Sequence, residues 1–127
     1  GKAKAALRSL EDKDFVFVHV EAPDEAGHNG NLREKILAIE RFDQLVVGTI
    51  LKAFKRKKNF RILVLPDHAT PISVKTHTSD IVPFGIFGKG IVGRGFLNYS
   101  ERQAEKSDLY FEKGYELLDF FIKTTEE

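Results

Sequence analysis

The sequence predicts an α/β domain with a mainly parallel sheet. Two short apolar runs, FVFVHV at 15–20 and RILVLP at 61–66, have the β-branched and aromatic composition of strands buried on both faces. Between them, residues 31–56 form one long amphipathic helical pattern. A strand, a helix and a strand in this order almost always form a right-handed crossover that joins parallel strands. We therefore expect the strands at 15–20 and 61–65 to lie parallel in one sheet.

The long helix has both a start signal and a regular apolar face. Asn31, with Glu34 three residues later, resembles a capping box in which Asn takes the Ser/Thr role. The apolar residues behind it recur at steps of three or four: Ile36, Ile39, Phe42, Val46, Ile50 and Phe54. This spacing predicts a helix that buries one side.

The remaining elements follow from local composition. The Ala-rich segment 2–10 predicts a short helix, and PFGIFG at 83–88 predicts a third strand. The Gly-rich stretch GKGIVGRG at 88–95 lacks a complete phosphate-loop pattern and predicts a flexible turn, with Lys89 and Arg94 as alternative phosphate contacts. Residues 107–124 predict a closing amphipathic helix. Its expected inner face comprises Leu109, Phe111, Leu117, Phe120 and Phe121.

Composition excludes several classes of protein. The 127 residues suit one domain or a large piece of one, and the absence of Cys rules out disulfides and thiolate metal sites. A net charge of +1 and one short basic cluster, at 55–61, argue against nucleic-acid or membrane partners. No apolar run is long enough for a spanning helix. Because the chain starts GKAKAALRSL and contains no Met, we expect a piece of a longer protein.

Two similar polar motifs follow the first two predicted strands. PDEAGH at 23–28 supplies Asp24 and His28, and PDHATP at 66–71 supplies Asp67 and His68. Ligands bind beyond the carboxyl ends of strands in open parallel sheets, so the two loops are expected to share one pocket. His77, in KTHTSD, can reach this pocket from the next loop.

Three imidazoles and two carboxylates suit divalent metals. Imidazole nitrogen favours zinc, manganese or iron, whereas carboxylate oxygen favours manganese and magnesium. Five ligands exceed the needs of one tetrahedral ion, so a pair of ions about 4 Å apart is expected, of the kind that handles phosphoryl groups. Taken singly, each residue has a plainer interpretation: Asp67 as a turn cap and His77 as an exposed loop histidine.

The fourth histidine, His19, falls inside the first predicted strand. It shares a face with Phe15 and Phe17, which indicates a core residue or a support for a metal ligand. Glu21 ends this strand and could orient a ligand or lie in solvent.

Residues 18–43 and 63–88 also resemble a specific family. The motifs P-D-x-x-x-H, P-D-H and T-H-T, the last followed by D-x-V-P-F, occur here in the order found in cofactor-independent phosphoglycerate mutases. The likeness is to the archaeal-type branch of this family, within the alkaline phosphatase superfamily, and it extends over about residues 2–122.

The resemblance implies a three-layer α/β/α domain with two metal ions, usually manganese or zinc, with magnesium as an alternative. One ion would be held by Asp24, His28 and His77. The other would be held by Asp67 and His68, together with an Asp and a Ser or Thr from an N-terminal half. That hydroxyl would carry the phosphoryl group while 3-phosphoglycerate becomes 2-phosphoglycerate. The resemblance thus implies a cytoplasmic enzyme of glycolysis and gluconeogenesis with a small phosphorylated substrate.

The chain departs from this family in what it lacks. Residues 1–127 contain no upstream strand with the nucleophile and no inserted substrate-binding domain. We therefore expect the C-terminal portion of the metal-binding domain, with no catalytic residue of its own, inactive alone and prone to self-association through unpaired edges. Two other hypotheses stay open: a different phosphatase or phosphotransferase of the superfamily, and a short non-catalytic metal-binding module.

Overall fold

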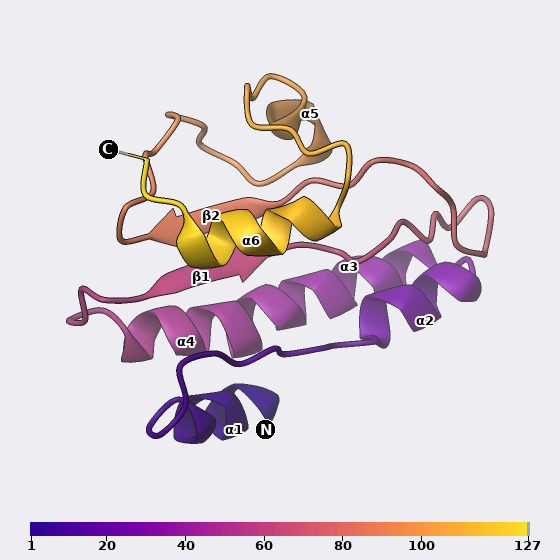
Figure 1. The fold of residues 1–127 in the computed structure, drawn as a ribbon. Helices are drawn as coiled ribbons and strands as arrows, with labels where there is room; N and C mark the ends of the chain where they lie inside the picture. Colours follow the sequence, from indigo (N-terminus) through magenta and orange to yellow (C-terminus); the bar gives the residue numbers. More distant parts are fainter. Residues whose placement is uncertain (127) are drawn as a thin grey trace. The chain divides into compact units, whose positions relative to one another are not determined.

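The structure is a computed structural model that describes residues 1–126 (Figure 1). The chain divides into two compact units. The first unit contains residues 1–56 and 70–78, and the second contains residues 57–69 and 79 onward. Among the described residues, no helix has the length and apolar character needed to cross a bilayer.

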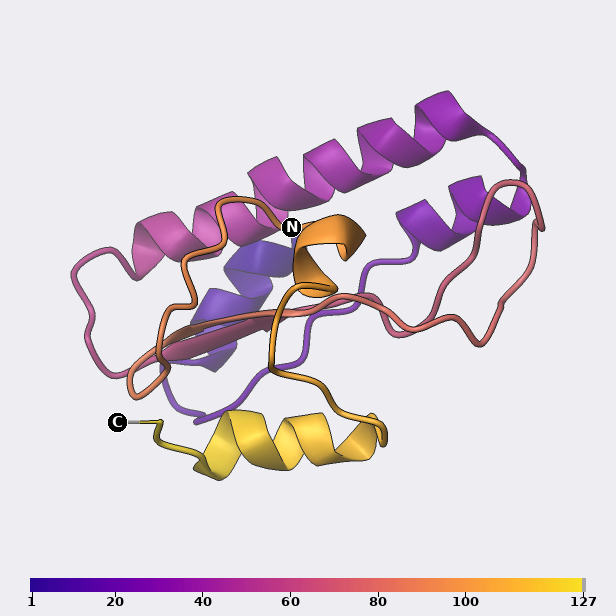
Figure 2. The same ribbon diagram turned by 90° about the horizontal axis from the view of Figure 1, so that it is seen from above.

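The first unit is built of helices. Its elements are α1 (Lys2–Ser9), α2 (Ala22–His28), α3 (Leu32–Arg41), the π-helical turn η1 (Phe42–Val47) and α4 (Gly48–Ala53). The last three continue one another as a single rod, with α2 beside its first part (Figure 2). The helices predicted at 2–10 and 31–56 are thus confirmed to within a few residues.

The start of the rod follows the predicted cap. Asn31 has an extended backbone, and its side-chain oxygen accepts a hydrogen bond from the Glu34 N–H at 3.0 Å. This bond satisfies one of the helix donors that have no partner within the helix.

Replacing Asn31 with Ala should lower the free energy of unfolding by about 1 kcal/mol, because the cap acceptor is lost. Urea denaturation followed by circular dichroism measures the change. Asn31→Asp is the matched control, since it keeps an oxygen acceptor at the helix N-terminus. Equal losses in the two variants would contradict the capping role.

The prediction of a buried strand at 15–20 is wrong for the described residues. This segment is extended but belongs to no sheet, and Phe15 and Phe17 are 45% and 73% exposed. On the predicted apolar face of the long helix, Ile36 and Ile39 are about half exposed as well. A strand needs a hydrogen-bonded neighbour, and neither of the two described strands pairs with this segment.

The second unit contains a two-stranded sheet. Strands β1 (Arg61–Val64) and β2 (Gly85–Gly88) confirm the strands predicted at 61–66 and 83–88. They pair antiparallel, from Arg61 opposite Gly88 to Val64 opposite Gly85, so the predicted parallel arrangement is not what this pair adopts. A crossover requires residues 15–20 to form a strand in the same sheet as 61–65, and the described sheet does not contain residues 15–20.

Two helices complete the second unit: α5 (Glu101–Ala104) and α6 (Tyr115–Lys123). Helix α6 lies along the strand pair (Figure 1), and Arg61 Nη1 donates to the Phe121 carbonyl oxygen at 2.8 Å. The Phe111 ring contacts the rings of Phe84 and Phe120, with centroids 5.9 and 5.3 Å apart. Among the described residues of this unit, Leu117 is the buried apolar side chain, and the three rings are partly buried.

The predicted helix at 107–124 begins only at Tyr115. Near the expected start, the Ser107 hydroxyl oxygen accepts a hydrogen bond from the Leu109 N–H at 3.1 Å. Ser side chains compete in this way with helical hydrogen bonds, and Gly114 adds a residue of low helix propensity. The helix predicted at 107–124 is therefore confirmed only in its second half, from Tyr115 onward.

Arg94 joins the Gly-rich turn to the C-terminal segment. Its guanidinium bonds Glu126 through Nη2 at 2.5 Å and Asp108 through Nε at 3.0 Å. Arg94, which the sequence suggested as an alternative phosphate contact, is thus bound by these two carboxylates. The hydrogen bond from Arg94 holds the pKa of Glu126 below its ordinary value of 4.5.

This depressed pKa predicts an acid-sensitive contact. A carboxylate with a lowered folded-state pKa stabilises the fold above its ordinary pKa and loses that contribution as the pH falls. Stability should therefore decline as the pH drops below about 4.5, and Glu126→Gln should flatten this decline. Thermal unfolding across a pH series measures it. Glu116→Gln, at an exposed helical position, is the control, and identical pH profiles for wild type and Glu126→Gln would contradict the assignment.

Candidate metal centre

Helix α2 carries the first two predicted ligands. Asp24 and His28 are four residues apart within Ala22–His28, so the helix turn brings their side chains to one face. The sequence indicated a loop here, and the structure corrects this to a helix with Pro23 in its first turn, where proline is tolerated. The helix fixes a spacing that a loop would leave variable.

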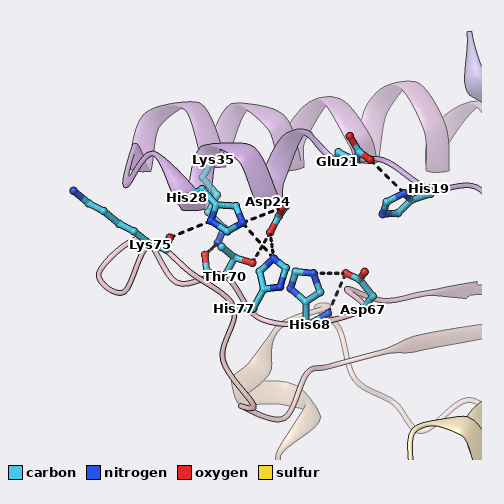
Figure 3. Close-up of polar contacts among 10 residues, drawn as sticks. All are labelled: His19, Glu21, Asp24, His28, Lys35, Asp67, His68, Thr70, Lys75 and His77. Carbon is cyan, nitrogen blue, oxygen red and sulfur yellow. Dashed lines mark hydrogen bonds and ion pairs between the residues drawn. The ribbon is translucent and has the colours of Figure 1, made fainter.

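His77 comes from the 70–78 segment and completes a triangle of side chains with Asp24 and His28 (Figure 3). His28 Nε2 lies 3.3 Å from Asp24 Oδ2, and His77 Nε2 lies 3.2 Å from Asp24 Oδ1. The two Nε2 atoms are 3.2 Å apart. The three side chains are 35–53% exposed, so an ion from solvent can reach them.

The spacing and the types of these side chains suit a divalent ion. Ligand atoms at about 2.1 Å from a tetrahedral zinc lie about 3.4 Å from one another. The observed separations of 3.2–3.3 Å are close to that value, although each histidine nitrogen is measured to a different oxygen of Asp24. Two imidazoles and one carboxylate also form a recognised ligand set for zinc sites with an open position.

The partner of His28 fixes which nitrogen faces the triangle. His28 Nδ1 lies 3.0 Å from the Lys75 carbonyl oxygen, which can only accept a hydrogen bond. Nδ1 must therefore carry the proton, and in the neutral ring Nε2 presents its lone pair toward Asp24 and His77. Such a bond is the usual way in which proteins orient a metal-binding histidine.

Asp24 is held by Thr70. The Thr70 hydroxyl donates to Asp24 Oδ1 at 2.6 Å, and the Thr70 carbonyl oxygen accepts from Lys35 Nζ at 2.5 Å. Helix α2 approaches Thr70 so closely that a Cβ at position 27 would overlap the Thr70 carbonyl oxygen, which explains the glycine there. Thr70 is 5% exposed, which makes it a buried polar residue with its hydroxyl satisfied.

The other two predicted ligands belong to the second unit. Asp67 Oδ1 accepts a hydrogen bond from the His68 N–H at 3.0 Å and lies 3.5 Å from His68 Nε2. Both contacts join adjacent residues of the chain. The assignment of Asp67 and His68 to a second metal ion stays a prediction.

His19 is not a core residue. Its ring is 53% exposed, and Nδ1 lies 4.0 Å from a carboxylate oxygen of Glu21, which is itself exposed (Figure 3). The sequence suggested burial because it predicted a two-sided strand at 15–20, and without that strand the ring faces solvent.

Three residues that support the triangle, directly or through a neighbour, were not predicted from the sequence: Lys35, Thr70 and Lys75. Thr70 follows His68 by two positions in PDHATP, and a hydroxyl so near predicted ligands is a usable signal. Lys75 contributes through its backbone carbonyl, and Lys35 through a contact between separate segments, so neither leaves a side-chain pattern in the sequence.

The side chains of the triangle are of the types that hold divalent metals, and comparison with known families points to a metal-dependent class of protein. The model of the Metalloenzyme superfamily matches residues 1–112, so the chain belongs to this superfamily. The superfamily assignment implies metal ions.

Two curated relatives indicate the branch of the superfamily. A protein from Methanosarcina acetivorans, named 2,3-bisphosphoglycerate-independent phosphoglycerate mutase, is 47% identical over 125 residues, covering 97% of this chain and 32% of the relative. A protein of the same name from Methanosarcina mazei is 57% identical over 88 residues, covering 68% of this chain and 22% of the relative. The resemblance to cofactor-independent phosphoglycerate mutases is confirmed, and the chain spans about a third of the length of the curated relatives that match most of it.

A solved structure supports the fold. A protein from Pyrococcus horikoshii superposes with a TM-score of 0.76 at 37% identity, covering 83% of this chain and 31% of that one.

Proposed function

We propose that the chain is the C-terminal, metal-binding portion of a phosphoglycerate mutase that interconverts 3-phosphoglycerate and 2-phosphoglycerate. The observation that carries this proposal is the triangle of Asp24, His28 and His77, with ligand atoms 3.2–3.3 Å apart, in a chain whose relatives bear that name. The complete protein is then a cytoplasmic enzyme whose α/β/α domain has a mainly parallel sheet.

Two divalent ions are proposed, manganese or zinc, with magnesium as an alternative. Asp24, His28 and His77 hold the first, and Asp67 and His68 contribute to the second. Only Ala69 separates His68 from Thr70, which binds Asp24, so covalent geometry keeps the Cα atoms of His68 and Thr70 within about 7 Å. Such ions supply charge neutralisation on phosphoryl oxygens and activation of a nucleophilic hydroxyl.

The residues of this chain hold the ions without repelling the substrate. Neutral imidazoles supply lone pairs but no negative charge, so His28, His68 and His77 leave the net positive charge of the ions available to a phosphate. The carboxylates of Asp24 and Asp67 each remove one unit of that charge. The nucleophile and the residues that recognise glycerate are proposed to lie outside residues 1–127.

A coupled assay of 2-phosphoglycerate formation tests the proposal. The full-length gene product, supplied with Mn²⁺ or Zn²⁺ and 3-phosphoglycerate, should form 2-phosphoglycerate, while the 127-residue chain should not. Release of inorganic phosphate without 2-phosphoglycerate would instead indicate a phosphatase of the same superfamily. Turnover by the 127-residue chain would refute the proposal that the nucleophile lies elsewhere.

We also propose that the isolated chain self-associates through the segment 15–20, with a second copy as the partner. Phe15 and Phe17 expose apolar rings on an extended segment that lies outside the described sheet, and such edges pair with other chains. Light scattering after size exclusion should give a mass above 14.4 kDa that rises with concentration. Phe17→Lys should shift the protein toward monomer, whereas Tyr115→Lys, which changes an equally exposed aromatic, should not. A monomer at every concentration would rule out this association.

A further inference from the structure

We propose that Thr70 and Lys75 are positioning residues that orient two metal ligands before the ion arrives. Thr70 orients Asp24 through its hydroxyl, and Lys75 orients His28 through its backbone carbonyl. The inference rests on the proposed metal site and adds two residues that are not themselves proposed ligands.

The Thr70 hydroxyl has little freedom. The residue is 5% exposed, its carbonyl oxygen is bonded by Lys35, and the α2 backbone at Gly27 closes one side. The hydroxyl donates to Asp24 Oδ1 at 2.6 Å, the short separation of a hydrogen bond from an O–H to a charged oxygen. A buried donor fixed in this way restricts rotation of the carboxylate.

This restriction sets the direction of both carboxylate oxygens. While Oδ1 accepts from Thr70, Oδ2 lies 3.3 Å from His28 Nε2. Rotation of the carboxylate would break the Thr70 bond and move Oδ2 away from the triangle. Thr70 therefore lowers the entropy that Asp24 would otherwise lose when an ion binds.

Lys75 has an unusual backbone conformation at the point where it meets His28. Its φ is 63°, in the left-handed region that non-glycine residues seldom adopt. The turn that precedes it is closed by a 2.8 Å bond from the Lys75 N–H to the Pro71 carbonyl oxygen. The Lys75 side chain also covers Gly30, where an added Cβ would lie 2.5 Å from Lys75 Cε.

The conformation has a local consequence. It directs the Lys75 carbonyl oxygen to within 3.0 Å of His28 Nδ1, which places the proton there and leaves Nε2 for the ion. Backbone conformations of this kind concentrate at functional sites, because the surrounding structure must maintain them. Here the fixed turn selects the tautomer of a ligand.

The Thr70 role is tested by metal affinity in the full-length gene product. Thr70→Val keeps the shape and removes the hydroxyl, and it should weaken Mn²⁺ or Zn²⁺ binding by about 10- to 100-fold in calorimetric titration. Thr70→Ser restores the donor and should bind within about threefold of wild type. Thr70→Val that binds as tightly as wild type would overturn this role.

The Lys75 role is tested without metal, by the ¹⁵N chemical shifts of the His28 ring in metal-free protein. At a pH where the ring is neutral, wild type and Lys75→Asn should both carry the ring proton at Nδ1, since Asn tolerates the left-handed conformation. Lys75→Val should lose that preference, because a β-branched residue disfavours it. Protonation of His28 at Nε2 in wild type, or an unchanged ring in folded Lys75→Val, would overturn this role.

The two failures are distinguishable. Wild-type protein that binds neither ion would overturn the proposed metal site and this inference together. This inference alone would be overturned if the wild-type protein binds an ion, Thr70→Val binds it equally well, and the ¹⁵N shifts of the His28 ring are unchanged in Lys75→Val. Circular dichroism tests whether each variant is folded. If Thr70→Val or Lys75→Val does not fold, the conservative variants Thr70→Ser and Lys75→Asn are compared with wild type instead.

Discussion

Replacing Asp24 with Asn is expected to reduce the affinity of the full-length gene product for Mn²⁺ or Zn²⁺ by more than about 100-fold. Loss of a hydrogen-bonding partner behind a ligand typically costs 10- to 100-fold, and Asp24 is itself a ligand in this account. Its two oxygens lie 3.2 and 3.3 Å from the two histidine nitrogens, so one substitution removes the group shared by both. Mutase turnover should fall in parallel.

Calorimetric titration measures the affinity, and the coupled assay measures the turnover. Asp43→Asn is the matched control, because Asp43 is an exposed carboxylate in the same unit. Retention of wild-type affinity by Asp24→Asn, with a loss in Asp43→Asn, would show that the ion lies elsewhere.

Replacing Gly88 with Ala is expected to destabilise the second unit by about 2–5 kcal/mol, from backbone strain together with overpacking. Gly88 ends β2 with φ of 133°, in a region that favours glycine. A Cβ there would overlap the Phe60 carbonyl oxygen and lie 2.8 Å from Arg61 Cα. Both are backbone atoms of the segment that leads into and begins β1, so relief requires the strand pair to shift.

Gly93→Ala is the matched control for this substitution. It changes another glycine of the same Gly-rich turn, but an added Cβ at position 93 would meet no atom within 4 Å. Chemical denaturation of both variants gives the comparison. A difference between them of under about 0.5 kcal/mol would contradict the close approach described for Gly88.

The helices and strands that sequence predicted correctly are those fixed by local chemistry. The long helix begins where Asn31 caps it, and the β1 and β2 segments form where aromatic and β-branched residues cluster. These features need only neighbours in the chain. The helix predicted over residues 107–114 does not form, and the reason is also local. Ser107 and Gly114 disfavour a helix there more than the apolar spacing favours one.

The direction of strand pairing could not be obtained in the same way. The two apolar faces of residues 15–20 indicate that other segments pack against them, but they do not identify those segments. In the structure Phe17 is 73% exposed, and β1 pairs with β2 instead. Pairing depends on which other strands are available, and this information lies outside the segment itself.

The side chains that gather at the candidate site could be proposed from the sequence, but the groups that hold them in place could not. Asp24, His28 and His77 carry the side chains that metals prefer, so their chemistry is visible in the sequence. The structure brings these three side chains together. Asp67 and His68 belong to the second unit, and their role as ligands of a second ion is a proposal. The Lys75 carbonyl is a backbone group, and no residue type marks where a turn will direct it.

The most direct test of the metal centre is anomalous diffraction from crystals of the full-length gene product grown with Zn²⁺, recorded at the zinc absorption edge. We expect an anomalous peak about 2 Å from the Nε2 atoms of His28 and His77 and from a carboxylate oxygen of Asp24. A zinc peak elsewhere, with these three side chains bound to no ion, would contradict this expectation.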